Sequence, residues 1–329
     1  MSQPDRPDEF SLIEQVFAPL SAEAPGAFGL TDDAAVFSPG EGMELVLTVD
    51  AIVEGVHFLS SDPADGIAQK LLRVNLSDLA AKGAIPRGYL LVTSWRPDTS
   101  LAWIESFAAG LRRDQQTFGI SLWGGDTVST PGPLTFSVTA IGEVPRGKLL
   151  RRSGARPGDD IYVSGTIGDG ALGLAAAEGQ LGGTLEDIQF LIDRYRCPQP
   201  RNALGPRLIG LASAALDVSD GLMADLTHMC ETSRVGARIE GARIPLSPAA
   251  SHAVDANSSW FGTALTGGDD YELLFAAAPE NASAIAAAAT ESDVPVTRIG
   301  TIMSREEGVH AVDSHGRPLT FSRLGFTHF

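Results

Sequence analysis

Residues 216–222, Leu-Asp-Val-Ser-Asp-Gly-Leu, join the end of an apolar strand to the start of an amphipathic helix and place two carboxylates at the join. The apolar residues that follow recur at helical spacing. Ser219 or Asp220 is therefore expected to cap the first turn, which leaves N–H groups for an anion. Asp217 and Asp220 repel a phosphate, so a phosphate ligand here requires a divalent cation. Taken alone, the motif is more typical of an acidic helix cap.

Similar carboxylates recur upstream. Each lies next to an expected strand or helix: Asp32 and Asp33 before the strand 34–37, Asp50 at the end of the strand 44–50, Asp78 beside the packing face of the helix 64–83, and Asp126 after the strand 120–123. Each acid alone is typical of a cap or a turn. Together they favour a polynuclear Mg²⁺ site, because Mg²⁺ is usually held by a few carboxylates with water and substrate phosphates.

The charge balance excludes several classes of partner. The chain has 24 basic and 41 acidic residues, a net charge of −17, so nucleic acid and anionic membranes, which bind basic surfaces, are not expected partners. Only Cys197 and Cys230 are present, which argues against a disulfide framework and favours a reducing cytoplasm. No segment reads as a signal peptide or a membrane-spanning helix.

Strands and helices alternate along the chain, which predicts an α/β fold of two domains. The segment 146–159, rich in arginine, proline and glycine, is the best boundary and divides the chain into domains 1–148 and 149–329. Helices are expected at 10–20, 64–83, 102–118, 171–178, 186–195 and 282–289, and further strands at 89–94, 134–144 and 160–164.

One glycine motif leaves a different function open. Residues 168–173, Gly-Asp-Gly-Ala-Leu-Gly, match a dinucleotide-binding fingerprint between an expected strand and an expected helix. No second strand presents a clear acid for a ribose, so a glycine-rich turn is the commoner explanation. An NAD-dependent oxidoreductase therefore stays as one alternative, and a non-catalytic sensor of Mg²⁺ and nucleotide as another.

Several long motifs, in order along the chain, resemble those of the thiamine-monophosphate kinase family, within the wider group of aminoimidazole ribonucleotide synthetase and selenophosphate synthetase. The matching segments are 74–83 (VNLSDLAAKG), 124–127 (GGDT), 152–159 (RSGARPGD), 217–222 (DVSDGL), 267–273 (GGDDYEL) and 325–329 (GFTHF). The resemblance implies a two-domain, PurM-like α/β fold that dimerises through its N-terminal domains, whose sheets join into a barrel, while the C-terminal domain is mixed α/β.

The resemblance also implies an activity and a set of site residues. The activity is transfer of the γ-phosphoryl group of ATP to thiamine monophosphate, giving thiamine diphosphate, with Mg²⁺ and K⁺ as cations. The metal ligands implied by the motifs are Asp33, Thr48, Asp50, Asp78, Asp126, Asp217 and Asp220. ATP would contact Gly125, Asp126, Arg152 and Ser219, and the thiamine substrate would face His57, Asp269 and Phe326. Asp126, Arg152 and Asp220 are the implied catalytic residues.

The chain departs from the family pattern at four positions: Thr31 replaces a glycine before the first acids, Val49 a hydroxyl residue, Asp269 a glutamate, and Phe326 a tyrosine or tryptophan. These changes affect the implied substrate contacts more than the implied metal ligands. A phosphate monoester is already a nucleophile, so a direct in-line transfer needs no general base. His57 as a core histidine and Phe326 as an apolar anchor remain the alternative interpretations of those two residues.

Overall fold

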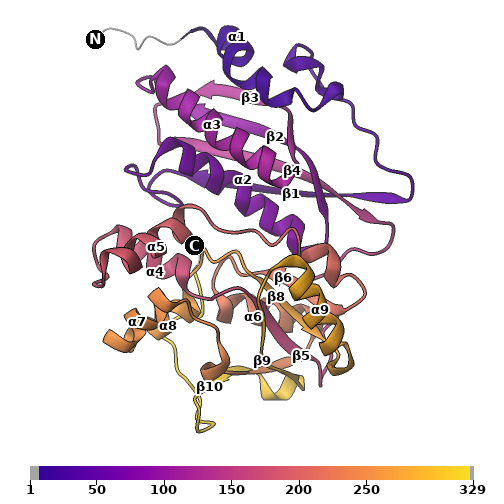
Figure 1. Cartoon of the computed structure of the whole chain (residues 1–329), viewed down its shortest axis with the longest axis vertical. Helices are drawn as coiled ribbons and strands as arrows, with labels where there is room; N and C mark the ends of the chain where they lie inside the picture. The colour runs from indigo at the N-terminus through magenta and orange to yellow at the C-terminus, as the bar shows by residue number, and fades with distance from the viewer. Residues whose placement is uncertain (1–6, 327–329) are drawn as a thin grey trace. The chain divides into compact units, whose positions relative to one another are not determined.

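The computed structural model describes residues 7–326 (Figure 1). By its internal contacts the chain forms two units. Unit 1 takes the chain up to Leu79 together with Ile85–Gly147, and unit 2 takes Ala80–Ala84 together with the chain from Lys148 onward. The mixed α/β class expected from the sequence is confirmed. The boundary at residue 148 stays a prediction, and of the motif 325–329 the residues 327–329 lie outside the described part.

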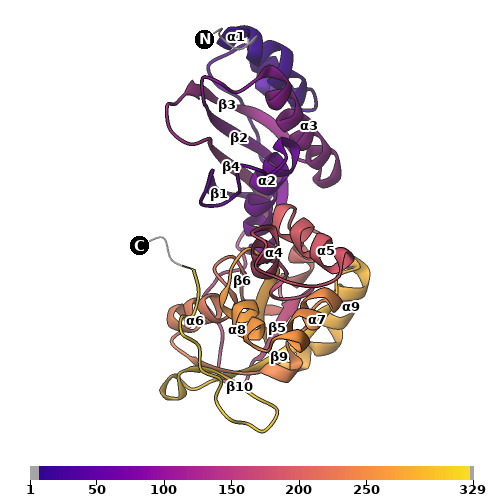
Figure 2. The ribbon, with the colours of Figure 1, turned by 90° about the vertical axis from the view of Figure 1, so that its left-hand side faces the viewer.

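Unit 1 is built on a four-stranded sheet in the order β1-β4-β2-β3. Its strands are β1 (Met43–Val53), β2 (Ile85–Trp95), β3 (Ser121–Ser129) and β4 (Thr135–Pro145). β4 pairs antiparallel with both of its neighbours, and β2 pairs parallel with β3. The helices α2 (Ala64–Ala81) and α3 (Leu101–Phe118) run along one face of this sheet (Figures 1 and 2).

Aromatic side chains fill the space between this sheet and α3. The ring of Trp95 on β2 meets Phe107 on α3 edge to face, with 5.5 Å between centroids. Phe107 in turn lies 4.6 Å from Phe136 on β4. All three side chains are buried. Since aromatic rings remove large areas of apolar surface from water, this cluster anchors α3 to two strands at once.

A buried ion pair joins the two helices of unit 1. The Arg73 guanidinium on α2 donates two hydrogen bonds to the Asp114 carboxylate on α3, from Nε to Oδ2 at 2.7 Å and from Nη2 to Oδ1 at 2.8 Å. Gln69 donates a third bond to Asp114, from Nε2 to Oδ1 at 2.8 Å. The Asp114 side chain has no exposed surface. A carboxylate that is buried this completely requires its cationic partner.

Unit 2 is built on a six-stranded sheet in the order β10-β7-β9-β5-β8-β6. Its strands are β5 (Asp160–Ser164), β6 (Ala212–Asp217), β7 (Gly236–Glu240), β8 (Leu273–Ala277), β9 (Val296–Met303) and β10 (Val309–Val312). Its helices are α4 (Asp169–Ala177), α5 (Leu185–Arg196), α6 (Leu222–Ser233), α7 (Pro248–Ala256), α8 (Ser259–Thr266) and α9 (Ala282–Ser292).

The central strands of unit 2 are covered on both faces. Along β8, Leu274 and Ala276 pack into one apolar cluster with residues of α4 and α6, whereas Leu273, Phe275 and Ala277 pack into another with residues of α9. All five residues of β8 are buried. Successive residues of a strand point to opposite faces, so a strand covered on both faces reads as a continuous apolar run.

Two predicted strand ends are wrong. Asp50 was expected to end its strand, but β1 continues to Val53 because its pairing with β4 extends to Thr135. Asp126 was expected to follow a strand, but β3 runs from Ser121 through the glycines to Ser129. Both carboxylates therefore lie inside strands, where the register determines the face on which each one projects.

Two other expectations near the N-terminus are also wrong. Residues 34–37 form no strand; Val36 N–H donates to the carbonyl of Gly26 at 2.9 Å, and Phe37 stacks on Trp123 instead. The single helix expected at 10–20 is divided into α1 (Glu9–Leu12), a π-helical turn (Ile13–Phe17) and a 3₁₀ turn (Ala18–Ser21). Pro19 lacks the N–H that a continuous helix would use.

No helix within the described residues 7–326 is both long and apolar enough to cross a membrane. The remaining described helical segments are short 3₁₀ turns: Pro25–Leu30, Gly205–Leu208, Gly241–Arg243, Pro279–Asn281 and Arg305–Glu307.

Replacing Arg73 with alanine is expected to destabilise unit 1 by about 3–5 kcal/mol, because it leaves the Asp114 carboxylate buried without its cation. Urea unfolding followed by tryptophan fluorescence measures this, since Trp95, Trp103 and Trp123 belong to unit 1 and only Trp260 to unit 2. Arg113→Ala is the matched control. It breaks an exposed α3–α2 pair with Asp65, at 2.6 Å, and should cost less than about 1 kcal/mol. Equal losses in the two variants would contradict the prediction.

Candidate functional site

Three of the predicted metal ligands are gathered in unit 1, where β1 faces α2. The Thr48 hydroxyl donates to Asp78 Oδ2 on α2. Two residues along β1, the Asp50 N–H donates to Oδ1 of Asn75 at 3.0 Å. Asn75 is fully buried and is itself fixed by a bond from its Nδ2 to the Leu71 carbonyl at 3.0 Å. The helix thus holds both ends of the segment 48–50, Thr48 through Asp78 and Asp50 through Asn75.

The charge of this cluster fits a cation. Burial, with a smaller contribution from the Asp78 carboxylate, raises the pKa of Asp50 to about 6. Two carboxylates and a hydroxyl are hard oxygen ligands of the kind that Mg²⁺ takes, with water and phosphate completing its shell. Within residues 7–326, no point is approached by three or more histidine, cysteine, aspartate or glutamate side chains. The Thr48, Asp50 and Asp78 cluster by itself offers part of a coordination shell.

A second group of predicted residues lies in unit 2, in the turn between β6 and α6. Asp217 ends β6, as expected, but the predicted cap of α6 is wrong. Neither Ser219 nor Asp220 caps the helix, whose first turn has no side-chain cap from the preceding residue Gly221. Instead Oδ2 of Asp225, one turn into the helix, accepts the N–H groups of Ser219, Asp220 and Gly221 at 3.1, 3.0 and 3.1 Å.

These bonds occupy the three N–H groups that directly precede α6, so those amides are not free for an anion. A buried carboxylate of the chain already occupies them, and Asp225 is only 3% exposed. Burial, with repulsion from Asp220, raises the pKa of Asp225 to about 7, and the N–H donors and the charge of Arg152 oppose this rise. Arg152, a predicted ATP contact, therefore lies within electrostatic reach of the turn.

The two predicted substrate residues of unit 2 are attached to the same turn by backbone hydrogen bonds. Asp269 N–H donates to the Ser219 carbonyl at 3.0 Å, and Phe326 N–H donates to the Asp220 carbonyl at 3.0 Å. Gly268 is required here, because a Cβ on it would lie 2.2 Å from the Ser219 carbonyl oxygen. The turn thus joins predicted metal, nucleotide and substrate residues within one unit.

The acidic and aromatic residues of the motif 267–273 form two groups, one with left-handed backbone and one with buried side chains. Asp269 and Tyr271 adopt left-handed backbone, with φ of 73° and 52°, and the Tyr271 hydroxyl donates to Asp269 Oδ1 at 3.1 Å. Asp270 and Glu272, between and after them, are buried. Left-handed backbone strains a residue that carries a Cβ, and such strain is typical of functional positions.

The buried acids of this motif hold neighbouring segments in place. Asp270 accepts the N–H groups of Gly168 and Gly170, at 2.7 and 3.0 Å, and burial raises its pKa well above the usual value. Glu272 accepts bonds from Arg194, at 3.0 Å, and from Arg201 and Ser164.

These contacts argue against a dinucleotide site at 168–173. Two of its amides already bond a carboxylate of the chain, and β5, the strand before the glycines, pairs antiparallel with both neighbours. A dinucleotide fold requires a parallel βαβ unit at this point and free amides for the pyrophosphate.

The remaining predicted residues of unit 1 belong to other segments of that unit. Asp33 is exposed in the segment 31–42, and its N–H donates to Oδ1 of the adjacent Asp32 at 2.8 Å. Asp126 is exposed, and the register, which pairs Asp126 with Val92, places it on the sheet face opposite the helices. Asp50 projects to the helix side, so β1 and β3 present these two carboxylates on opposite faces.

Two further predicted residues have roles in local structure. A Cβ on Gly125 would lie 1.8 Å from the Leu91 carbonyl oxygen, so only glycine allows β3 to pair with β2 at this point. His57 Nδ1 accepts the Val53 N–H at 3.1 Å, which leaves Nε2 as the N–H of the neutral ring.

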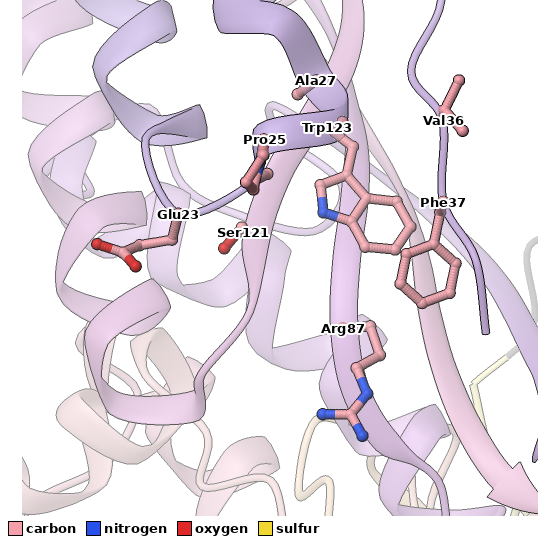
Figure 3. Close-up of a pocket in the computed structure, with 10 residues that line it drawn as sticks. Glu23, Pro25, Ala27, Val36, Phe37, Arg87, Ser121 and Trp123 are labelled. Carbon is pink, nitrogen blue, oxygen red and sulfur yellow. The ribbon is translucent and has the colours of Figure 1, made fainter. Parts of the chain in front are cut away.

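The structure also contains a cavity of about 220 Å³ in unit 1. Figure 3 shows Phe37 beside the Trp123 ring, with the Arg87 side chain below the two rings. The two rings stack with 4.3 Å between centroids, and Arg87 pairs with Glu143 at 2.7 Å. None of the residues that line the cavity belongs to the predicted site.

Sequence reasoning missed Asn75 and Asp225, which fix the two groups of site residues. A signal for Asn75 was present, since it precedes Asp78 by three residues and therefore lies on the same helix face. Asp225 had a weaker signal: it is an acid among apolar residues in the first turn of a helix, which is typical of an interaction with N-terminal amides.

Comparison with known proteins covers both units. A family model for the AIR synthase related protein, N-terminal domain, matches residues 31–144, and one for the C-terminal domain of the same family matches residues 156–313. The chain is 45% identical to the thiamine-monophosphate kinase of Caulobacter vibrioides over 325 residues, which cover 98% of this chain and 91% of that protein.

Solved structures agree with this relationship. The thiamine-monophosphate kinase of Stenotrophomonas maltophilia K279a has a TM-score of 0.84 and 42% identity, covering 95% of this chain and 98% of its own. AaThiL complexed with AMPPCP and TMP has a TM-score of 0.76 and 29% identity, and the match covers 98% of this chain and 97% of that chain. This chain, similar to these kinases through both of its units, belongs to the thiamine-monophosphate kinase family.

Proposed function

We propose that this protein transfers the γ-phosphoryl group of ATP directly to thiamine monophosphate, giving thiamine diphosphate, the last step in making that cofactor. The observation that carries the proposal is the turn 217–221, where the main chain joins the predicted metal ligands Asp217 and Asp220 to the predicted substrate residues Asp269 and Phe326. The proposal includes a cytoplasmic location and no nucleic-acid or membrane partner, as charge and cysteine content predict.

Mg²⁺ ions would be held by the residues that the family motifs assign: Asp33, Thr48, Asp50, Asp78, Asp126, Asp217 and Asp220. K⁺ is the further cation that the resemblance implies. When bound, Mg²⁺ lowers the repulsion between the two anionic phosphates and withdraws charge from the transferred group. The Thr48, Asp50 and Asp78 cluster supports this assignment, since two carboxylates there share one partly buried region.

The chain's own residues would bind and orient the two substrates. Gly125, Asp126, Arg152 and Ser219 are assigned to ATP, and the Arg152 guanidinium is suited to stabilise charge on the transferred phosphoryl group. His57, Asp269 and Phe326 are assigned to the thiamine part. The Asp269 side chain would lie against the cationic ring, and Phe326 would stack on it in place of the usual tyrosine or tryptophan. The acceptor phosphate is itself the nucleophile, so no aspartate forms a covalent intermediate.

We further propose a homodimer formed through unit 1, with the two sheets joined into a barrel. Apolar side chains are exposed on the sheet face that α2 and α3 do not cover: Leu45, Leu47, Val49, Leu90, Val92 and Val128. A second copy of the same face is the occupant that fits, because identical apolar faces are self-complementary across a two-fold axis. Asp126 projects on this face as well.

Asp126→Asn is expected to lower thiamine diphosphate formation by at least about a hundredfold with little change in fold, because the variant loses the charge of a ligand assigned to the metal and the nucleotide. The measurement is ADP release and product chromatography with ATP and Mg²⁺, with and without thiamine monophosphate. Asp98→Asn, an exposed acid on a surface turn, is the control and should retain full turnover.

Near-normal turnover in Asp126→Asn would refute the assignment of that residue. Wild-type protein that binds ATP but releases no ADP with any thiamine acceptor would refute the proposed reaction, and would favour a sensor of Mg²⁺ and nucleotide.

Leu47→Asp is expected to convert the dimer to a monomer of 34.5 kDa, because it places a charge on the apolar face, at a leucine of β1 that is 63% exposed. Light scattering after size-exclusion chromatography measures this. Turnover should fall along with the dimer, since Asp126 lies on the same face. Leu185→Asp replaces a 90% exposed leucine of α5 and is the matched control. A wild-type monomer would disprove the interface.

Affinity for Mn²⁺, a spectroscopic substitute for Mg²⁺, is expected to fall about tenfold between pH 7 and pH 5. The raised pKa of Asp50, about 6, means that this carboxyl ionises over that range, and only the ionised form attracts the cation strongly. Calorimetry of the nucleotide-free protein measures the effect, and Asp50→Asn should reduce the pH dependence. An unchanged pH dependence in that variant would assign the effect to other carboxylates.

A further inference from the structure

We propose that Asp225 is a positioning residue, which sets the conformation of the turn 218–221 and prevents its amides from binding phosphate directly. The proposal rests on the proposed function for the assignment of Asp217, Ser219 and Asp220 to metal and nucleotide. Its own basis is the triple hydrogen bond to one oxygen of a buried side chain.

The three bonds define one arrangement of the turn. Oδ2 of Asp225 lies 3.0–3.1 Å from the nitrogens of three consecutive residues, Ser219, Asp220 and Gly221. The amide before them, that of Val218, donates to the Glu272 carbonyl at 2.8 Å. Every amide from Val218 to Gly221 therefore has an acceptor in the protein itself. Three donors that converge on one oxygen leave the turn little freedom to change.

The same bonds determine how the turn can meet a phosphate. Consecutive amides at the start of a helix normally form a direct site for an anion. Here the carboxylate of Asp225 takes the place of that anion. The amides of Ser219, Asp220 and Gly221 are thus not available to a phosphate, which side chains of the turn, or a cation held by them, would bind instead.

Asp225 also acts on the substrate residues, through the carbonyl groups of the turn. The Ser219 carbonyl accepts from Asp269 N–H, and the Asp220 carbonyl accepts from Phe326 N–H. A change in the peptide planes at 219–221 would move both acceptors. Asp225 itself is buried and is not a candidate for contact with ATP or thiamine.

The test compares Asp225→Asn with the wild type by hydrogen exchange of the peptide spanning 217–222, without metal or substrates. The variant keeps an acceptor oxygen but loses its charge, so exchange at 219–221 is expected to be at least about tenfold faster. Mn²⁺ affinity by calorimetry, and the Mg²⁺ concentration for half-maximal turnover, should both weaken about tenfold. Turnover with Mg²⁺, ATP and thiamine monophosphate all saturating should stay within about threefold.

Asp313→Asn is the matched control, because Asp313 Oδ1 also accepts backbone amides of its own turn, those of His315 at 2.8 Å and Arg317 at 2.9 Å. Asp313 lies outside every predicted site, so exchange at 217–222, metal affinity and turnover should not change. A loss of metal affinity in both variants would mean that any weakened turn has this effect, and would overturn the specific role of Asp225.

Two other results would overturn the proposal. One is unchanged exchange and unchanged metal affinity in Asp225→Asn. The other is fast exchange at 219–221 in the wild type itself, which remains decisive if the variant fails to fold. Neither depends on turnover, so they are distinct from a failure of the proposed reaction, which would appear as wild-type protein that forms no thiamine diphosphate.

Discussion

Hydrogen bonds from backbone amides to buried carboxylates fix the centre of unit 2. Asp225 binds three amides at the start of α6, and Asp270 binds the amides of Gly168 and Gly170 at the start of α4. Each carboxylate holds the turn that follows a strand: Asp225 the turn after β6, at the edge of the sheet, and Asp270 the turn after β5, inside it. Since a buried carboxylate is costly unless its oxygens are satisfied, each of these turns can exist only in the conformation that supplies the donors.

The two sheets differ in how their faces are covered, and this difference affects where the predicted site residues lie. In unit 2 both faces of β8 are buried, so the residues of β8 belong to the core. The predicted site residues of unit 2 lie at the end of β6 or in the turns outside the strands. In unit 1 one face is covered by helices and the other is exposed. Asp50 and Asp126 can therefore project from inside strands, on opposite faces. Where a site residue lies follows from how its sheet is covered.

Sequence reasoning predicted the parts of the fold that local patterns determine. The helices α2, α3 and α6 follow from apolar residues at helical spacing, and α/β alternation gives the fold class. It failed where pairing with a neighbouring strand determines how long a strand is. β1 and β3 extend beyond Asp50 and Asp126 because pairing with β4 and β2 continues, and no local signal reports the length of a partner strand.

The same distinction applies to the acids of the site. Asp217 was predicted correctly at the end of β6, because an apolar run stops there. The cap of α6 was not, because Ser219 and Asp220 are favourable cap residues by type, while the acceptor for those amides lies one turn into the helix. Composition cannot separate an acid that binds the protein's own amides from one that faces a ligand. In a chain of net charge −17, Asp225 and Asp270 are of the first kind, satisfied by amides. The proposed function places Asp50 and Asp78 in the second kind, since these two carboxylates lie close to each other and a bound cation would lower their repulsion.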